Sequence, residues 1–151
     1  MPAPTLVFGW GNPSRGDDAL GPLFVDAVET LALAGVECLT DFQLQIEHAL
    51  DLEGRERVLF VDASLATDFG AEEAFRVEPL RPRSDPSLTT HAMSPAALLQ
   101  VYADVEGRAP PAAWLLAIQG LRWELGEAPS AQALRHLALA LEWAKAWLAR
   151  E

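Results

Sequence analysis

The chain has 151 residues, which is enough for one domain and too few for two of ordinary size, so we expect a single domain over residues 1–151. Hydrophobic residues make up 50% and charged residues 22%, a balance typical of folded globular proteins that excludes disordered and collagen-like chains. The 22 Asp and Glu residues against 11 Lys and Arg give a net charge of −11, which disfavours nucleic acid and anionic membranes as partners because their phosphates would be repelled.

The beginning of the chain predicts a buried strand, a tight turn and a helix. The apolar run 5–8 leads into the Gly- and Pro-rich segment 9–13. From Asp18 onward apolar residues recur every three or four positions, which indicates an amphipathic helix, and Gly35 follows its end. Neither a basic segment nor a long apolar one precedes the strand, so we expect no secretory signal.

A second strand is expected over residues 36–40, closed by Asp41. This strand contains the only cysteine, Cys38, which we interpret as a small buried hydrophobe. One cysteine can form neither an intrachain disulfide nor a CxxC metal site, which suits a reducing compartment. Because no apolar stretch is long enough to span a membrane, we expect a cytoplasmic protein.

The middle of the chain predicts a short helix at 46–52, followed by the clearest strand of the sequence. This strand is the continuous apolar run 58–61, which we expect Asp62 to end. A weaker strand is expected at 74–77. Residues 79–90 hold three prolines and little periodicity, so this segment is predicted to be a loop.

Two helices and one strand complete the prediction. Ser94, followed by proline, is expected to begin a helix that extends to about Val105, and the apolar run 113–118 predicts a strand. Ser130 is expected to cap a long last helix. The predicted apolar face of this helix consists of Leu134, Leu137, Leu141 and Ala144, with Trp143 and Trp147 packing on a neighbouring face.

Strands that alternate with helices favour an α/β fold. The strands are continuous apolar runs, which is typical of a mainly parallel sheet covered by helices on both faces. The sequence contains no internal repeat and no linker. We therefore predict a single three-layer α/β domain.

Polar residues follow several of the predicted strands. In open α/β sheets, ligands bind beyond the carboxyl ends of the strands, where the strand order reverses. Asp17 and Asp18 follow the first strand, Asp41 the second and Asp62 the third, and His91 lies in a loop just before a helix. Two carboxylates and an imidazole with open positions suit a divalent metal. We therefore expect a candidate metal site at this edge of the sheet.

These residues also have simpler explanations. An acid at a helix N-terminus stabilises the helix by about 0.3–1 kcal/mol, which accounts for one of Asp17 and Asp18 but not readily for both. His91 alone would be an ordinary loop histidine, and its interest comes from the neighbouring acids. The other two histidines, His48 and His136, are interpreted as surface or core-edge residues of helices.

Two other kinds of site fit the sequence poorly. The glycine loop has the spacing G-x-G-x-x-x-x-G instead of G-x-G-x-x-G, and Asp17 and Asp18 would repel a pyrophosphate at the helix N-terminus. A serine hydrolase would need a G-x-S-x-G turn, which is absent, and Ser64 lacks the strand–turn–helix context.

Four motifs in order resemble the hydrogenase maturation proteases, the endopeptidases that trim the large subunit of nickel–iron hydrogenases. The resemblance extends from Leu6 to the last helix, and the segment 43–52 is further similar to the branch that serves cytoplasmic NAD-reducing hydrogenases. The four motifs are Gly9-Trp10-Gly11-Asn12, Asp17-Asp18-Ala19-Leu20-Gly21, Val61-Asp62-Ala63 and His91-Ala92-Met93-Ser94-Pro95.

The resemblance implies a twisted sheet of about five strands between helices, and it implies a site. The metal-contacting residues of the family fall on Asp18, Asp62 and His91, which would also be the catalytic set, while Asp41 matches a further acid near the cleft. The substrate would be the large-subunit precursor, shortened at its C-terminus after nickel insertion. Nickel would be carried by the substrate, and no permanently bound cofactor is expected.

Details of the site stay open at this point. Asp17 is a candidate general base on proximity alone, and Glu47 and His48 carry further groups able to bind a metal. Trp10 stands where the family often has an aliphatic residue and is expected to line or narrow the cleft. Two other functions remain as alternatives: a nickel-sensing maturation chaperone without proteolysis, and a small-molecule hydrolase or nucleotide-binding domain.

Overall fold

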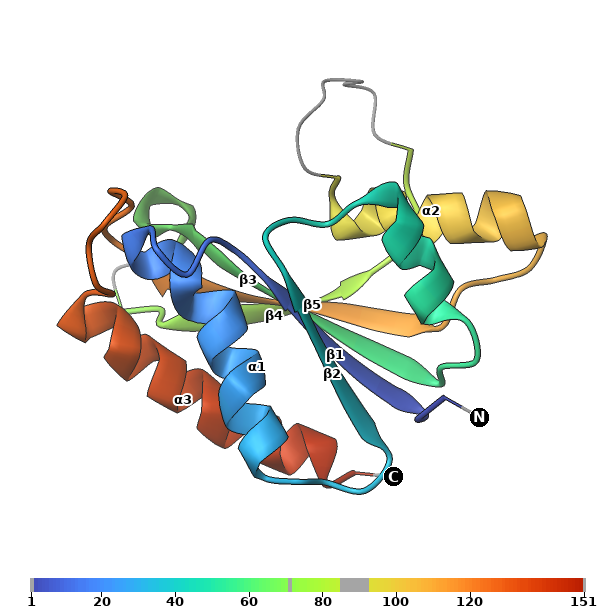
Figure 1. Cartoon of the computed structure of the whole chain (residues 1–151), viewed down its shortest axis with the longest axis horizontal. Coiled ribbons are helices and arrows are strands. Elements are labelled where there is room, and N and C mark those ends of the chain that lie inside the picture. The colour runs from blue at the N-terminus through green and yellow to red at the C-terminus, as the bar shows by residue number, and fades with distance from the viewer. Residues whose placement is uncertain (1, 71, 85–92, 151) are drawn as a thin grey trace.

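A computed structural model describes residues 2–70, 72–84 and 93–150 of the chain (Figure 1). The strands are β1 (Thr5–Trp10), β2 (Val36–Asp41), β3 (Arg57–Leu65), β4 (Phe75–Leu80) and β5 (Ala112–Gly120). The α-helices are α1 (Leu20–Thr30), α2 (Pro95–Glu106) and α3 (Ala131–Leu148). Three 3₁₀ helices connect them: η1 (Gly16–Ala19), η2 (Ile46–Leu52) and η3 (Ala66–Asp68).

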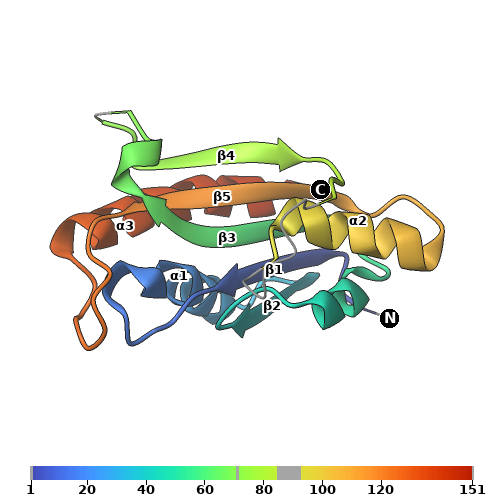
Figure 2. The same cartoon turned by 90° about the horizontal axis from the view of Figure 1, so that it is seen from above.

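The five strands form one sheet in the order β2-β1-β3-β5-β4. All neighbouring pairs are parallel except β4 and β5, which are antiparallel. Helices α1 and α3 pack together on one face of the sheet, while α2 and η2 lie on the other (Figures 1 and 2). The predicted α/β fold with a mainly parallel sheet between helices is therefore confirmed.

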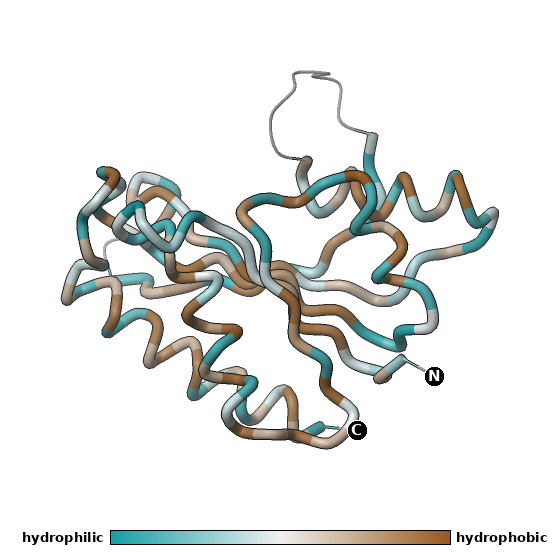
Figure 3. The backbone as a smooth tube through the Cα atoms, in the orientation of Figure 1, coloured by the Kyte–Doolittle hydropathy of each residue, from teal (hydrophilic) through white to brown (hydrophobic). Residues whose placement is uncertain are grey.

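The side chains of each strand alternate between two cores, as the two-residue period of a strand requires. In β3, Leu59, Val61 and Ala63 face α1 and α3, whereas Val58 and Phe60 face α2 and η2. The central strands contain continuous hydrophobic runs because helices cover both faces of the sheet (Figure 3). Ser94 caps α2 as predicted, its hydroxyl accepting a hydrogen bond from the Ala97 amide at 3.1 Å.

Two predicted element ends are wrong. Strand β3 does not end at Asp62 but continues to Leu65, because β5 provides a pairing partner as far as Gly120. Strand β4 extends through Pro79, which the sequence prediction assigned to a loop. Proline is tolerated there because β4 is an edge strand, where an amide facing away from β5 would have no ladder partner. Of the predicted loop, residues 85–90 lie outside the described residues.

The predicted apolar face of the last helix needs one correction. Leu134 is 43% exposed, whereas Ala133, His136 and Ala140 on α3 are buried. The helix presents a wider buried face than the leucine spacing suggests, because small side chains allow α3 to approach the sheet and α1 closely. Trp147 packs edge-on against Trp114, with ring centroids 5.4 Å apart, so its predicted packing role is confirmed.

No helix within residues 2–70, 72–84 and 93–150 is both long and apolar enough to cross a membrane.

Candidate functional site

The candidate site lies where the strand order reverses, between β1 and β3. From β1 the chain passes through η1 and α1 to β2 on one side, whereas β3 lies on the other side of β1. The last residue of β3 that pairs with β1 is Val61, opposite Gly9. Asp62 is the next residue, and Asp18 belongs to η1 directly after β1. The sequence prediction that both acids reach this edge is correct, although Asp62 reaches it from within a strand.

Glycines without side chains allow these segments to approach one another. A Cβ atom on Gly21 would lie 2.4 Å from the Trp10 carbonyl oxygen and 3.0 Å from that of Val61. A Cβ atom on Gly11, whose φ is +149°, would lie 1.9 Å from the carbonyl oxygen of Asp18. Both contacts are with backbone atoms, which cannot rotate away. The glycines therefore hold the start of α1 against the ends of β1 and β3, with Asp18 close to Asp62.

Asp62 is a half-buried carboxyl group with unusual electrostatics. Its pKa is raised to about 7, first because burial disfavours the carboxylate and second because the negative charge of Asp18 is nearby. A backbone hydrogen bond from Ala63 opposes this rise in pKa. A divalent cation would offset both causes, since its charge would balance the two carboxylates. This pair of acids is therefore poised to accept either a proton or a cation.

Asp18 is positioned by the loop that follows β1. Its Oδ2 accepts a hydrogen bond from the Asn12 amide at 2.7 Å, and the Asn12 side chain in turn accepts one from the Ser14 amide at 2.9 Å. These bonds order the glycine-rich loop around the carboxylate. The Asp18 side chain is partly exposed in spite of these hydrogen bonds. The side chain thus keeps acceptor capacity for a ligand.

Asp17 has a structural role, so its assignment as a candidate general base is wrong. Its side chain is fully buried, and its Oδ2 accepts hydrogen bonds from the Leu121 amide, the Arg122 amide and the Ser130 hydroxyl at 2.7, 3.0 and 2.8 Å. The Ser130 amide donates to Oδ1 at 2.6 Å. Burial raises the pKa of Asp17, but these hydrogen bonds outweigh it and lower the pKa overall. Asp17 therefore fixes the connection from β5 to α3.

Asp41 and His48 form a second polar pair at the end of β2. The Gln45 amide donates to His48 Nδ1 at 2.8 Å, so this nitrogen carries no proton. His48 Nε2 then donates to Asp41 Oδ2 at 3.1 Å. Both ring nitrogens are occupied, and the ring packs edge-on against Phe8. His48 is therefore a buried core-edge residue, as the sequence prediction proposed, and its lone pair is not directed at the site.

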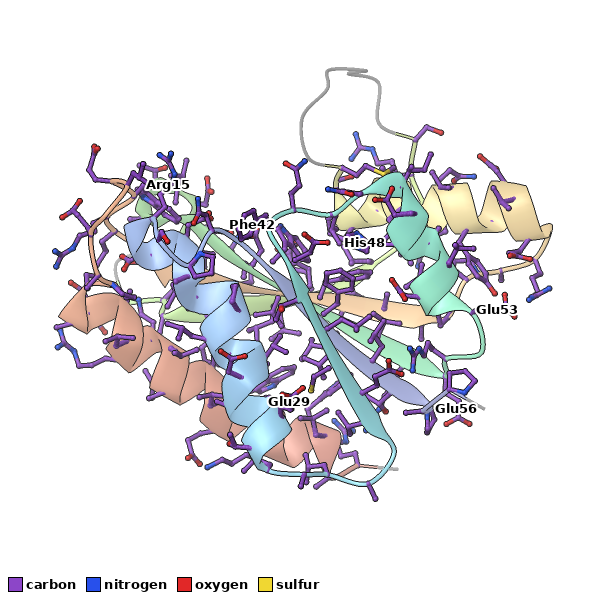
Figure 4. The ribbon with its side chains drawn as sticks, viewed as in Figure 1. Arg15, Glu29, Phe42, His48, Glu53 and Glu56 are labelled. Carbon is purple, nitrogen blue, oxygen red and sulfur yellow. The ribbon has the colours of Figure 1, made fainter. Side chains whose placement is uncertain are left out.

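Asp41 links this pair to the glycine-rich loop. Its backbone carbonyl accepts a hydrogen bond from the Gly11 amide at 3.1 Å, and its Oδ1 accepts one from the Phe42 amide at 2.6 Å. The Phe42 side chain is 68% exposed just beyond β2 (Figure 4). Asp41 therefore supports the loop that carries Asp18.

A groove lies on the same sheet face as Asp62. In the sheet register Asp62 pairs with Ala117, and Ala117 pairs with Arg76. These three residues lie on one face, and adjacent strands are about 4.8 Å apart, so Arg76 stands about 10 Å from Asp62. Its guanidinium pairs with Glu73 at 2.6 Å. The groove is lined by Ser64, Asp68, Phe69, Arg76, Glu78, Leu115 and Ala117.

Three other residues singled out in the sequence are wholly or partly buried. Trp10 is 7% exposed and packs edge-on against Phe60, because its position in β1 turns it toward the α2 core. It follows Gly9, the partner of Val61, so it adjoins Asp62 on the same face of the sheet, and its expected place beside the cleft stays a prediction. His136 is also buried, and its Nδ1 donates to the Gln119 carbonyl oxygen at 2.9 Å. Cys38 is half-buried, and burial, followed by the charges of Glu29 and Glu37, raises its pKa to about 11.

The third predicted ligand, His91, lies outside the described residues. Within the described ranges no group of three or more His, Cys, Asp or Glu side chains could hold a metal ion by itself. The described part of the site is therefore the carboxylate pair Asp18 and Asp62. Sequence position identified both acids, but burial and mutual repulsion are evident only in the structure.

The chain is similar to known proteins in structure, but not in sequence comparisons. No protein-family model matches the sequence, and no curated protein matches it. The [NiFe] hydrogenase maturation protease HycI of Thermococcus kodakarensis KOD1 is similar with a TM-score of 0.74 and 20% identity, over 98% of this chain and 94% of that one. The hydrogenase maturating endopeptidase HybD of E. coli gives 0.74 and 23%, over 98% and 92%.

A third similar structure is the hydrogenase 2 maturation peptidase from Thaumarchaeota archaeon SCGC_AB-539-E09, with a TM-score of 0.67 and 22% identity over 97% of this chain and 99% of that one. At these identities the comparisons establish the fold, which is that of the hydrogenase maturation proteases over nearly the whole chain. The resemblance predicted from the sequence motifs is confirmed at the level of the fold.

Proposed function

We propose that the protein is a hydrogenase maturation endopeptidase, which removes the C-terminal extension of the nickel-loaded large-subunit precursor of a nickel–iron hydrogenase. The observation that carries the proposal is the carboxylate pair Asp18 and Asp62, which stands at the switch point of a fold shared with such proteases. The sequence similarity of segment 43–52 extends the proposal to a substrate from the cytoplasmic NAD-reducing branch.

In this account Asp18, Asp62 and His91 engage nickel that the substrate already holds. Carboxylate and imidazole ligands suit nickel, and two carboxylates balance its charge. Asp62 gives up its proton when the cation arrives, because the cation offsets both the burial and the repulsion from Asp18. The protease is thereby sensitive to whether nickel has been inserted.

The reaction is hydrolysis of one peptide bond by water. Nickel held by the substrate beside Asp18 and Asp62 would supply either polarisation of the scissile carbonyl or a lowered pKa of the attacking water. The peptide would run along the sheet face of Asp62, where a groove of about 170 Å³ can receive part of it. Asp17 takes no part in proton transfer, since its carboxylate oxygens accept four hydrogen bonds from the protein.

The proposal is tested by intact mass spectrometry of purified, nickel-loaded precursor after incubation with the protein. Nickel-free precursor serves as the control. We expect a C-terminal truncation with nickel and none without it. An intact precursor that binds the protein would indicate a nickel-sensing chaperone. Neither binding nor cleavage, together with metal-independent nucleotide affinity, would favour a small-molecule or nucleotide-binding domain.

A further inference from the structure

An apolar groove lies between η2 and α2, away from the carboxylate pair. Its walls contain Ile46, Leu50 and Val105, whose side chains are 61%, 73% and 72% exposed. Ala49, Val101 and Tyr102 complete the apolar lining. Exposed aliphatic side chains from two packed elements are a feature of surfaces that bind another protein.

The rim of this groove is acidic. Its two charged lining residues are Glu47 and Glu106, and neither is in ion-pair contact with a Lys or Arg of the described ranges. The nearby Arg108 pairs with Glu53 instead. A second copy of this chain would bring the same two glutamates and a net charge of −11, so charge disfavours self-association through this face. The groove fits an amphipathic segment with aliphatic side chains flanked by Lys or Arg.

Both elements that form the groove, η2 and α2, are connected to the candidate site. Element η2 is joined to the end of β2 by the hydrogen bond from His48 to Asp41, and the exposed Phe42 lies between them in sequence. Helix α2 packs into the same core as Phe60 of β3, two residues before Asp62. A protein segment held in the groove is therefore held at a fixed distance from the carboxylate pair.

We propose that the η2–α2 groove is a docking site for the large-subunit precursor, which it binds through an amphipathic, Lys- or Arg-bearing segment outside the cleaved extension. This inference rests on the proposed function for the identity of the partner. Docking remote from the cleaved bond raises the affinity for the folded precursor and aligns its C-terminus with the site. It does not participate in the chemical step.

The test is the Kd of the purified precursor for variants of the full chain, measured by isothermal titration calorimetry. Leu50→Lys/Val105→Lys places positive charge in the groove at two exposed positions. Leu134→Lys/Leu139→Lys is the matched control, because these leucines are 43% and 55% exposed on α3 and the change in net charge is the same. We expect the groove variant to raise the Kd on the order of tenfold and the control to stay within about twofold of the wild type.

The charge requirement is tested separately with Glu47→Lys/Glu106→Lys, which should weaken binding and reduce its dependence on salt concentration. An unchanged Kd for the groove variant, or no binding of the precursor by the wild type, would overturn the docking proposal. So would self-association of the wild type that the groove variant abolishes. Binding through the groove without any shortening of the precursor would instead refute the protease proposal and leave the docking site intact.

Discussion

Asp17 and Asp18 are adjacent in sequence, yet their carboxylates serve opposite purposes. Asp17 is fully buried and accepts four hydrogen bonds from Leu121, Arg122 and Ser130. Asp18 accepts one from Asn12 and lies close enough to Asp62 to raise the pKa of that group. Asp17 therefore stabilises the fold, whereas Asp18 faces the candidate site.

Substitution of each acid by asparagine should separate these roles. Asp17→Asn places an amide NH₂ against backbone donors, so we expect the free energy of unfolding to fall by roughly 2–4 kcal/mol. Asp18→Asn loses one charged acceptor at a partly exposed position and should cost about 1 kcal/mol or less. Urea denaturation at pH 7 followed by tryptophan fluorescence measures both. Equal losses for the two variants would contradict the division of roles.

Asp62 should make the protein less stable as the pH rises. Its pKa is raised to about 7 in the folded protein from an ordinary value of 3.8. Folding therefore favours the protonated form, and the resulting stability is fully present below about pH 4 and is lost as the pH rises through 7. Because each tenfold change in proton affinity corresponds to about 1.4 kcal/mol, the loss is on the order of 4 kcal/mol.

Asp62→Asn should remove this contribution, because the amide does not ionise. The difference in unfolding free energy between the variant and the wild type should grow in favour of the variant between pH 4 and pH 8. Denaturation curves of both proteins across this range provide the measurement. Other carboxylates titrate in both proteins, so only the difference is diagnostic. A difference that is constant with pH would show that Asp62 is an ordinary carboxyl group.

The same group should give cleavage the opposite pH dependence. A protonated Asp62 cannot balance a cation, so cleavage of nickel-loaded precursor should decline as the pH falls below 7. Bound nickel shifts this decline in the cleavage rate to lower pH, because the cation favours the carboxylate form of Asp62. Single-turnover rates between pH 5 and pH 8.5 test this. A rate that rises steadily toward acid pH would exclude an ionised Asp62 from the reaction.

Gly21→Ala should disturb the site through packing alone. The added methyl would meet backbone atoms of Trp10 and Val61, which forces α1 away from β1 and β3. We expect a stability loss of about 1–3 kcal/mol and slower cleavage, because Asp18 moves relative to Asp62. Gly70→Ala is the matched control, since its methyl would meet nothing within 4 Å. Thermal unfolding of both variants should show a loss only for Gly21→Ala.

The sequence predicted the strands and helices well where apolar runs and caps mark them, as at Ser94 and Ser130. It misplaced the end of β3, because an acid after an apolar run resembles a strand end. Whether the strand continues at Asp62 depends on pairing with β5, which is far away in the sequence. Likewise Pro79 resembles a loop residue, and only its place on an edge strand allows it to extend β4.

The candidate site was predicted in outline. The rule that ligands bind at strand ends identified Asp18 and Asp62, but it also made Asp17 a candidate site residue. The distinction depends on where Ser130 lies, because its amide and hydroxyl donate to Asp17 across more than a hundred residues of chain. The η2–α2 groove has no signal in the sequence, since Leu50 and Val105 become neighbours only through the packing of two separate elements.

The Asp18→Asn variant shows whether the carboxylate pair acts on a nickel-loaded substrate. After folding has been verified, cleavage of nickel-loaded precursor by this variant and by the wild type is compared by intact mass spectrometry. We expect truncated precursor with the wild type and intact precursor with Asp18→Asn. Truncation by the variant at the wild-type rate would contradict this expectation and would leave Asp18 with no role beyond ordering the loop at Asn12.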